Sequence, residues 1–289
     1  MVQDSHIQAR GISFRCRDWG GDGRDILLLH GLASNARFWD LMAPHLHEYH
    51  LVAVDQRSHG LSGKPEEGYD FANFAADVAA VIETLGLRRP VVVGHSWGGN
   101  VGMQVALDYP ELLASLVCID GGTIDLAAVP GATWEETAKV MAPPDFGAMR
   151  LPWEAFLERA QSRAHGPMWG DGLEGFLRDS FETLPDGTVL PHLRMDKHIR
   201  VLRAIWDQGV SALFAGVTCP VLLMPARQER DGPPPSGWEG AKEGEATRAL
   251  DLLPNARLVW MEDSIHDVPV QRPAAVAQVI REAEADGFL

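Results

Sequence analysis

Short stretches of uninterrupted apolar residues recur along the chain and predict buried strands. Runs that are apolar at every position are typical of strands covered on both faces, as in a parallel sheet. A looser alternation over residues 6–20, followed by Gly20-Gly-Asp-Gly23, predicts a strand or hairpin that ends in a turn. The apolar runs lie at Ile26–Leu29, Leu51–Val54, Val91–Val93, Leu116–Ile119, Val221–Met224 and Leu258–Met261.

Helical patterns separate these strands. In Phe71–Leu85 the apolar residues recur at steps of three and four, which places one apolar stripe toward a sheet, and Gly86 provides a stop. Residues 97–109, 240–253 and 273–285 predict further helices. Strands that alternate with helices imply right-handed crossovers, so the sequence predicts a three-layer α/β fold with a mostly parallel central sheet.

The alternation is interrupted between residues 121 and 215. This stretch predicts helices near 134–142, 152–165, 173–184 and 196–208, without a strand. Because strands before and after it are needed for one sheet, we interpret 121–215 as an inserted helical cap rather than a separate helical domain. The core would comprise 1–120 and 216–289, with the cap over the sheet edge where ligands bind in open α/β folds.

The most informative local motif is Gly94-His95-Ser96-Trp97-Gly98, a G-x-S-x-G pattern. A strand is predicted before it and a helix after it, which is the context of a nucleophile elbow. So sharp a turn strains the serine backbone and leaves no room for side chains at the two glycines. Ser96 is therefore the candidate nucleophile, exposed over the positive end of a helix.

With this motif in place, nearly the whole chain outside the cap resembles the α/β-hydrolase superfamily. Leu27-Leu-Leu-His-Gly-Leu32 is similar to the family's His-Gly strand end, and Asp55-Gln-Arg-Ser-His-Gly-Leu-Ser62 resembles its Asp-x-Arg-Gly-His-Gly-x-Ser loop. Ser58 replaces the usual glycine, a change outside the chemistry. The resemblance implies that the backbone N–H groups of Leu32 and Trp97 form an oxyanion hole, which stabilises a tetrahedral intermediate.

The resemblance also points to a base among the 11 histidines of the chain. His266 follows the last predicted strand, where the family keeps its catalytic histidine. By contrast, we expect His30, His59 and His95 to be structural hydrogen-bonding residues. His165, His192 and His198 lie in the predicted cap, and we interpret them as ordinary polar residues or pocket lining.

The acid of the triad has two candidates. The commonest family pattern places it after the strand that follows the cap, near Glu229, but no aspartate lies there and Ala226 replaces the usual glycine. A variant pattern of some relatives uses the end of the strand before the cap, which is Asp120. Either carboxylate could orient His266. We favour Asp120, since two glycines follow it and let the chain turn, whereas Glu229 lies in a charged loop.

The composition limits the partners. The formal net charge of −15 disfavours binding to nucleic acid or to an anionic membrane surface. No apolar stretch is long enough to span a bilayer, and the N-terminus has no signal-peptide core. Cys16, Cys118 and Cys219 lack metal-binding spacing and fit a reducing compartment, so a cytoplasmic location is expected. No motif for a metal or a dinucleotide is present, and we expect no cofactor.

These features predict hydrolysis of a carboxylic ester or lactone through an acyl-enzyme. Ser96 replaces the aspartate nucleophile of the family's dehalogenases and epoxide hydrolases, which disfavours those reactions. Aromatic residues in the predicted cap favour an apolar or aromatic small-molecule substrate, although most of them are expected to pack the cap. Alternatives are carbon–carbon bond hydrolysis of a β-diketone-like substrate, a side activity similar to that of cofactor-free haloperoxidases, and a ligand receptor built on the fold. The sequence does not indicate an oligomeric state. The cap aromatics are Trp134, Phe146, Trp153, Phe156, Trp169, Phe176, Phe181 and Trp206.

Overall fold

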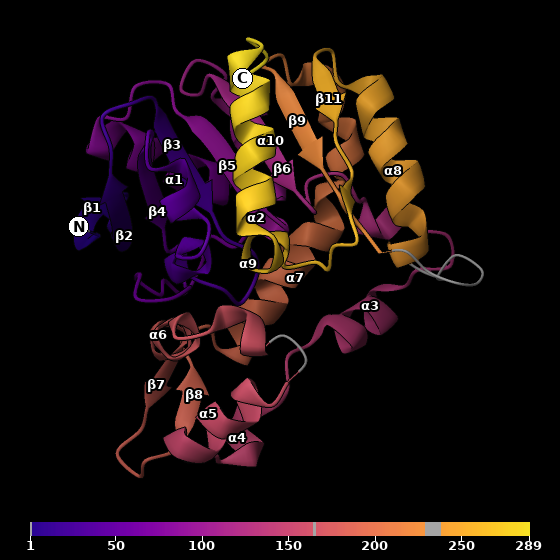
Figure 1. The fold of residues 1–289 in the computed structure, drawn as a ribbon. Helices are drawn as coiled ribbons and strands as arrows, with labels where there is room; N and C mark the ends of the chain where they lie inside the picture. The colour runs from indigo at the N-terminus through magenta and orange to yellow at the C-terminus, as the bar shows by residue number, and fades with distance from the viewer. Residues whose placement is uncertain (1, 164–165, 229–237) are drawn as a thin grey trace.

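The computed structural model describes residues 2–163, 166–228 and 238–289. Within these residues a twisted sheet of eight strands has the order β1-β2-β4-β3-β5-β6-β9-β11 (Figure 1). β1 and β2 form an antiparallel hairpin at one edge, and β2 also pairs antiparallel with β4. All strand pairs from β4 to β11 are parallel. The strands are β1 (Gln3–Ala9), β2 (Ile12–Gly20), β3 (Asp25–Leu29), β4 (His50–Val54), β5 (Val91–His95), β6 (Ser115–Ile119), β9 (Val221–Met224) and β11 (Ala256–Leu258).

Both faces of the sheet are buried, which is why each central strand contains an uninterrupted apolar run, such as Ile26–Leu29 in β3. Alternate residues of each strand enter two separate cores. Leu27 and Leu29 of β3 lie in the core that α1 and α2 cover, while Ile26 and Leu28 lie in the core under α10. The helices next to the sheet are α1 (Phe71–Leu85), α2 (Trp97–Asp108), α8 (Trp238–Leu252), α9 (Val268–Gln271) and α10 (Pro273–Ala285).

The three-layer α/β fold predicted from the sequence is confirmed, but one predicted strand is divided into two. The predicted strand Leu258–Met261 is divided, because β11 ends at Leu258 and a separate strand, β12 (Met261–Glu262), pairs with β10 (Ala226–Arg227). Pro225 lies between β9 and β10 and has no N–H to donate. The ladder is therefore interrupted at this point.

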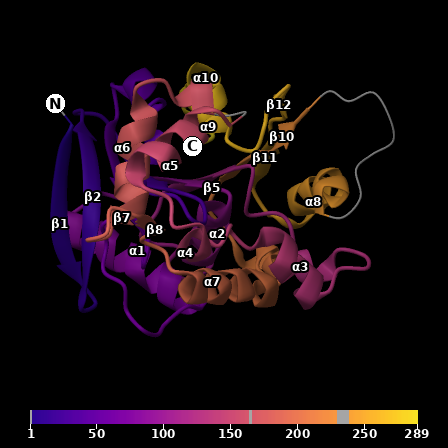
Figure 2. The ribbon, with the colours of Figure 1, turned by 90° about the horizontal axis from the view of Figure 1, so that it is seen from below.

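The end of the segment between β6 and β9 returns to the sheet, since Phe214 packs into the core that α1 and α2 cover. The rest of the segment lies beyond the carboxyl ends of the parallel strands, below the sheet in Figure 1 and toward the viewer in Figure 2. It also contains a hairpin, so our expectation that this segment has no strand is wrong. The predicted helix 173–184 ends at Ser180, and an Asp186-Gly187 turn, with Gly187 at φ 82°, joins the two short strands. The elements are α3 (Trp134–Met141), α4 (Phe146–Met149), α5 (Trp153–Gln161), α6 (Gly172–Ser180), β7 (Phe181–Thr183), β8 (Val189–Pro191) and α7 (Met195–Gln208).

None of the helices in the described residues combines the length and the apolar character that a bilayer crossing requires.

Candidate active site

Ser96 occupies the turn between β5 and α2. Its backbone has φ 52° and ψ −123°, a conformation that costs energy in a residue other than glycine. A Cβ atom on Gly94 would lie 2.3 Å from the Gly98 carbonyl oxygen, and one on Gly98 would lie 2.2 Å from the Leu29 carbonyl oxygen. The glycines of the motif are therefore required by the close approach of β3, β5 and α2.

Asp120 follows β6, the strand next to β5, and its backbone is also left-handed, with φ 44°. The side chain is 1% exposed. Its Oδ2 lies 2.6 Å from Nδ1 of His266. Its Oδ1 accepts a hydrogen bond of 2.8 Å from the Ala226 N–H and lies 2.8 Å from Nζ of Lys242. The carboxylate is thus held from three directions.

These contacts decide the charge of the carboxyl group. Burial alone would raise the pKa of Asp120, but the hydrogen bond and charge of His266 and the ammonium of Lys242 outweigh it and hold the pKa below its usual value of 3.8. Asp120 is therefore an anion at neutral pH. The other candidate acid, Glu229, lies outside the described residues.

His266 lies in the loop after β12, and its imidazole is 45% exposed. With Nδ1–H donating to Asp120, Nε2 is left as an acceptor, as a general base requires. No hydrogen bond joins the Ser96 hydroxyl to the imidazole in the part of the chain that the structure describes. Such catalytic bonds are often long or poorly aligned until substrate binds.

His95, next to Ser96, fixes the backbone of His266. Its Nε2–H donates to the His266 carbonyl oxygen over 2.9 Å, and its ring stacks on Phe38 with centroids 4.5 Å apart. Burial is the main cause that lowers the pKa of His95 to about 4, so the ring is neutral at pH 7. The sequence indicated a structural role for His95, but gave no signal that its partner is His266, the candidate base.

The amides of Leu32 and Trp97 are the two predicted oxyanion donors. Trp97 is the first residue of α2, so its N–H has no intrahelical acceptor. Neither amide donates to an acceptor among the described residues. A Cβ atom on Gly31 would lie 3.1 Å from Cβ of Ser96, so the loop that carries Leu32 lies directly beside the serine.

The remaining motif histidines support these loops. His30 is fully buried; its Nδ1–H donates to the Gly31 carbonyl oxygen over 2.8 Å, and its Nε2 accepts from the N–H of Gln56 over 3.0 Å. The His59 ring stacks on Trp97 with centroids 5.0 Å apart. Burial lowers the pKa of both histidines, His30 to about 4.

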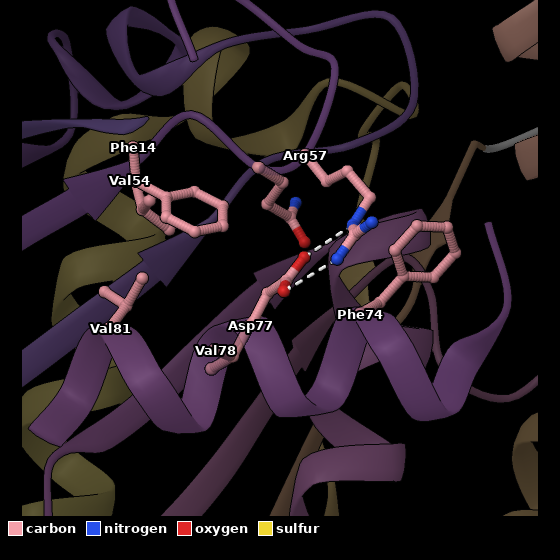
Figure 3. Close-up of a pocket in the computed structure, with 8 residues that line it drawn as sticks. Phe14, Val54, Arg57, Phe74, Asp77, Val78 and Val81 are labelled. Atoms are coloured by element: carbon pink, nitrogen blue, oxygen red, sulfur yellow. Dashed lines mark hydrogen bonds and ion pairs between the residues drawn. The ribbon is translucent and has the colours of Figure 1, made fainter. Parts of the chain in front are cut away.

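Loop 55–62, which resembles the family's second motif, is anchored by a buried ion pair. The guanidinium of Arg57 donates to both carboxylate oxygens of Asp77 on α1, over 2.6 and 2.9 Å (Figure 3). The cavity beside this pair measures only about 10 Å³, which suits a single water molecule at most. Ser58, where the family has glycine, has φ 65°, which explains that preference.

A cavity of about 50 Å³ lies between the Leu32 loop and the elements inserted after β6. Phe146, Phe181 and Leu193 give it an apolar wall. Ser34 also lines it, and the Ser34 Oγ is buried without a hydrogen-bond partner in the described part of the chain. The sequence analysis missed Ser34, since a lone serine in a loop carries no signal.

Most aromatic residues of this segment pack against one another. Phe156 and Phe181 have ring centroids 4.4 Å apart, and Trp134 packs edge-on against Trp206 at 6.1 Å. Across the described residues, no three histidine, cysteine, aspartate or glutamate side chains are grouped closely enough to hold a metal ion.

Comparison with known proteins agrees with this fold. A family profile described as the alpha/beta hydrolase fold matches residues 26–208, and the chain belongs to this family of hydrolases.

Individual relatives match over limited lengths. A 2-(acetamidomethylene)succinate hydrolase of Mesorhizobium japonicum is 44% identical over 101 residues, which are 35% of this chain and 36% of that protein. A non-heme chloroperoxidase of Streptomyces lividans is 35% identical over 180 residues, which cover 57% of this chain and 60% of that protein. The chain thus matches less than two thirds of the length of either relative.

A crystal structure of E-2-(acetamidomethylene)succinate hydrolase superposes with a TM-score of 0.78 at 23% identity and covers 98% of both chains. At that identity the likeness extends to the fold alone.

Proposed function

We propose that the protein hydrolyses a carboxylic ester or lactone through an acyl-enzyme formed on Ser96. The observation that supports this most is the 2.6 Å contact between Asp120 and Nδ1 of His266, one strand away from a serine in a strained elbow. A buried carboxylate on the far nitrogen of an imidazole is the arrangement that makes the near nitrogen a base.

In the proposed reaction, the Ser96 oxygen attacks the ester carbonyl carbon while Nε2 of His266 takes the hydroxyl proton. The carbonyl oxygen becomes an oxyanion that the Leu32 and Trp97 amides stabilise. The imidazolium then gives its proton to the leaving alcohol as the carbon–oxygen bond breaks. Water next attacks the acyl-enzyme with His266 again as base, which releases the carboxylic acid and restores the serine.

The contacts of Asp120 suit this role. The carboxylate is anionic, and the hydrogen bond from Ala226 N–H fixes its rotation so that Oδ2 faces the imidazole. An ionised carboxylate holds the Nδ1–H tautomer and stabilises the imidazolium that forms during acylation.

The cavity beside Ser34 supports an apolar or aromatic substrate. It adjoins the loop that carries Leu32, and its wall is mainly aromatic and aliphatic. A small apolar group of the substrate would be desolvated there. The Ser34 hydroxyl would offer one hydrogen bond to a polar atom of the substrate next to that apolar group.

A second candidate reaction is hydrolysis of an N-acyl bond by the same residues. Both the sequence and the structural comparison include a hydrolase named for 2-(acetamidomethylene)succinate, a compound with an acetamide group. Amide cleavage needs a protonated leaving nitrogen, and His266 would supply that proton.

The test is turnover of p-nitrophenyl acetate, an aryl butyrate, a δ-lactone and an N-acetyl enamide by the wild type and by Ser96→Ala. We expect one substrate class to be cleaved and a loss of at least about 10³-fold in kcat on substitution. Ser162→Ala, a change at the exposed end of α5, is the matched control and keeps full activity. Turnover that survives Ser96→Ala would refute the proposal.

A further inference from the structure

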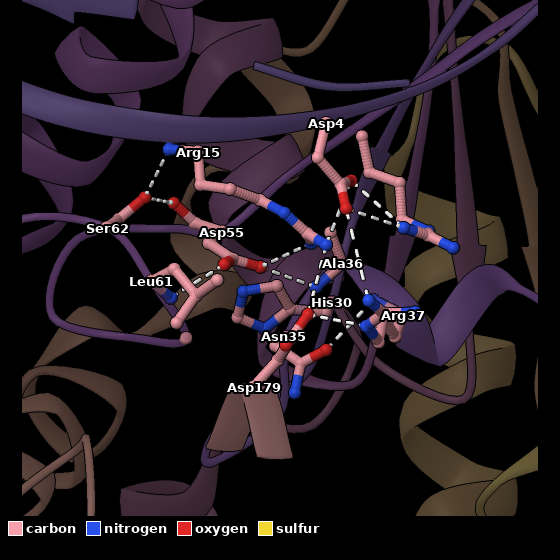
Figure 4. A network of polar contacts seen from close by, with 12 residues as sticks. Asp4, Arg15, His30, Asn35, Ala36, Arg37, Asp55, Leu61, Ser62 and Asp179 are labelled. Carbon is pink, nitrogen blue, oxygen red and sulfur yellow. Dashed lines mark hydrogen bonds and ion pairs between the residues drawn. The ribbon is translucent and has the colours of Figure 1, made fainter. Parts of the chain in front are cut away.

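A buried network of charges joins helix α6 to the loop that carries Leu32 (Figure 4). Asp179, in the last turn of α6, accepts hydrogen bonds from Nε of Arg37 over 2.6 Å and from Nη2 of Arg15 over 3.0 Å. Arg15 lies on β2 and is fully buried. Both cations therefore belong to the core, while their shared carboxylate comes from the segment inserted after β6.

Asn35 makes a second connection between the same two parts. Its Nδ2 donates to the Phe176 carbonyl oxygen over 2.9 Å and to the Ser180 hydroxyl over 2.7 Å, both on α6. Its Oδ1 accepts from the Arg37 N–H over 2.9 Å and so caps the short helix that follows. One buried side chain thus holds α6 and the loop at once.

On the core side, the same loop is held by Asp55 at the end of β4. The Asp55 Oδ1 accepts from the Ala36 N–H over 2.6 Å and lies 3.4 Å from Nη1 of Arg15. Arg15 therefore bridges the carboxylates of Asp55 and Asp179. A displacement of α6 would remove one of the three carboxylates that lie within 3.4 Å of this buried guanidinium. The third carboxylate within reach, Asp4, is 39% exposed.

The Leu32 amide depends on these anchors. A turn closed by a 3.3 Å hydrogen bond from the Ser34 N–H to the Gly31 carbonyl oxygen contains Leu32, and Asn35 follows it directly. The turn is fixed on one side by β3 and on the other by Asn35 and its neighbour. A shift at Asn35 thus changes the direction of the Leu32 N–H.

We infer that docking of α6 through Asp179 and Asn35 sets the oxyanion hole, so that the stabilising amide of Leu32 is in place only when α6 is docked on the core. This inference rests on the proposed function, because it assigns Leu32 its role there. Asn35 and Asp179 act as positioning residues, through the Leu32 loop and without touching the substrate. The arrangement would couple closure over a bound substrate to completion of the oxyanion hole.

Three variants distinguish an effect of the contacts between α6 and the Leu32 loop from a general loss of stability. Asn35→Ser keeps an oxygen that can cap the Arg37 N–H but is too short to reach Phe176. Asp179→Asn keeps the shape of the side chain and removes its charge. Asp25→Asn is the control, because this carboxylate is also buried but lies at the other end of β3 from the Leu32 loop, where it contacts His50 and the Arg88 N–H.

Two readouts are measured on the full chain. The first is ester kinetics, in which both α6 variants should lose at least about tenfold in kcat with KM changed less than about threefold. They should also lose about the same factor in affinity for a trifluoromethyl ketone, which forms an oxyanion on the serine. The second is hydrogen–deuterium exchange, which should become faster at residues 31–40 in these variants and not in Asp25→Asn.

The outcomes distinguish this inference from the proposed reaction. If Ser96→Ala abolishes turnover but Asn35→Ser and Asp179→Asn match Asp25→Asn in kcat and in exchange, the coupling is overturned and the reaction stands. If the wild type cleaves no substrate while exchange at 31–40 rises in both α6 variants, the link between α6 and the loop stands and the proposed reaction fails. Loss of kcat together with faster exchange supports both.

Discussion

Gly121 packs against the backbone of the candidate nucleophile, and this contact gives a sharp prediction. An ideal Cβ atom on Gly121 would lie 2.1 Å from the carbonyl oxygen of Ser96 and 2.6 Å from its Cα. Cβ atoms in real proteins do not approach backbone atoms closer than 3.0 Å. Gly121→Ala must therefore push the elbow and the turn after β6 apart by about 1 Å, since both neighbours are rigid backbone.

The displacement separates Ser96 from Asp120, the residue before Gly121, and so from His266. A misplacement of about 1 Å in a catalytic group can cost about 100-fold in rate. We expect kcat of Gly121→Ala to fall by about that factor, and the free energy of unfolding to drop by an amount typical of overpacking, about 1–3 kcal/mol.

The assay is steady-state hydrolysis of the best ester substrate, with active-site titration by a fluorophosphonate to count intact serines. Gly244→Ala is the control, because Gly244 lies in α8 with nothing within 4 Å of an added Cβ. Alanine there should stabilise the helix by about 1 kcal/mol and leave kcat unchanged. If Gly121→Ala keeps wild-type kcat while it folds normally, the elbow does not depend on the tight contact described above.

Two further predictions concern pH. Lys242→Met removes a cation that helps to hold the pKa of Asp120 below 3.8; the stability that this depressed pKa provides is present above 3.8 and is lost as the pH falls through the folded-state value. In the variant we expect the unfolding temperature to begin falling at a higher pH on acidification, and superimposable profiles would contradict this. Burial alone would lower the pKa of His50, but its 2.7 Å hydrogen bond to Asp25 and the nearby charges of Asp18 and Asp25 outweigh burial and raise it. The contribution of His50 to stability is therefore complete below its ordinary pKa of 6.5 and is lost as the pH rises through the raised value. We expect His50→Asn to lose about 1 kcal/mol at pH 6 and less at pH 9 in urea unfolding, and an equal loss at both values would refute the assignment.

The parts of the fold that the sequence predicts are those with a strong local pattern. The strands β3 to β6 each contain an uninterrupted apolar run because both faces are covered, and α1 shows its buried stripe at helical spacing. The β7–β8 hairpin was missed because each strand has only three residues, although the Asp186-Gly187 turn was a readable signal. Short strands bury too little surface to leave a periodic pattern.

The sequence predicts those parts of the site in which a local motif determines the backbone. It does not predict the parts in which contacts between distant residues determine which groups come together. Ser96 could be chosen as the candidate nucleophile because its turn demands glycines on both sides. Lys242 and Ala226 lie more than a hundred residues from Asp120 in sequence, and only folding places them on its carboxylate. A lysine or an alanine so far along the chain gives no indication in the sequence that it contacts Asp120.

Backbone strain is a criterion for choosing the acid of the triad, and it is visible only in the structure. Ser96 and Asp120 end adjacent strands, and both have positive φ without being glycine. Such conformations persist where surrounding contacts enforce them, and they are found most often at functional sites. Positive φ alone does not decide, since Arg10 and Arg150 share it in exposed turns. At Asp120 it coincides with a buried carboxylate that three donors hold, so the strain there serves to aim an anion at His266.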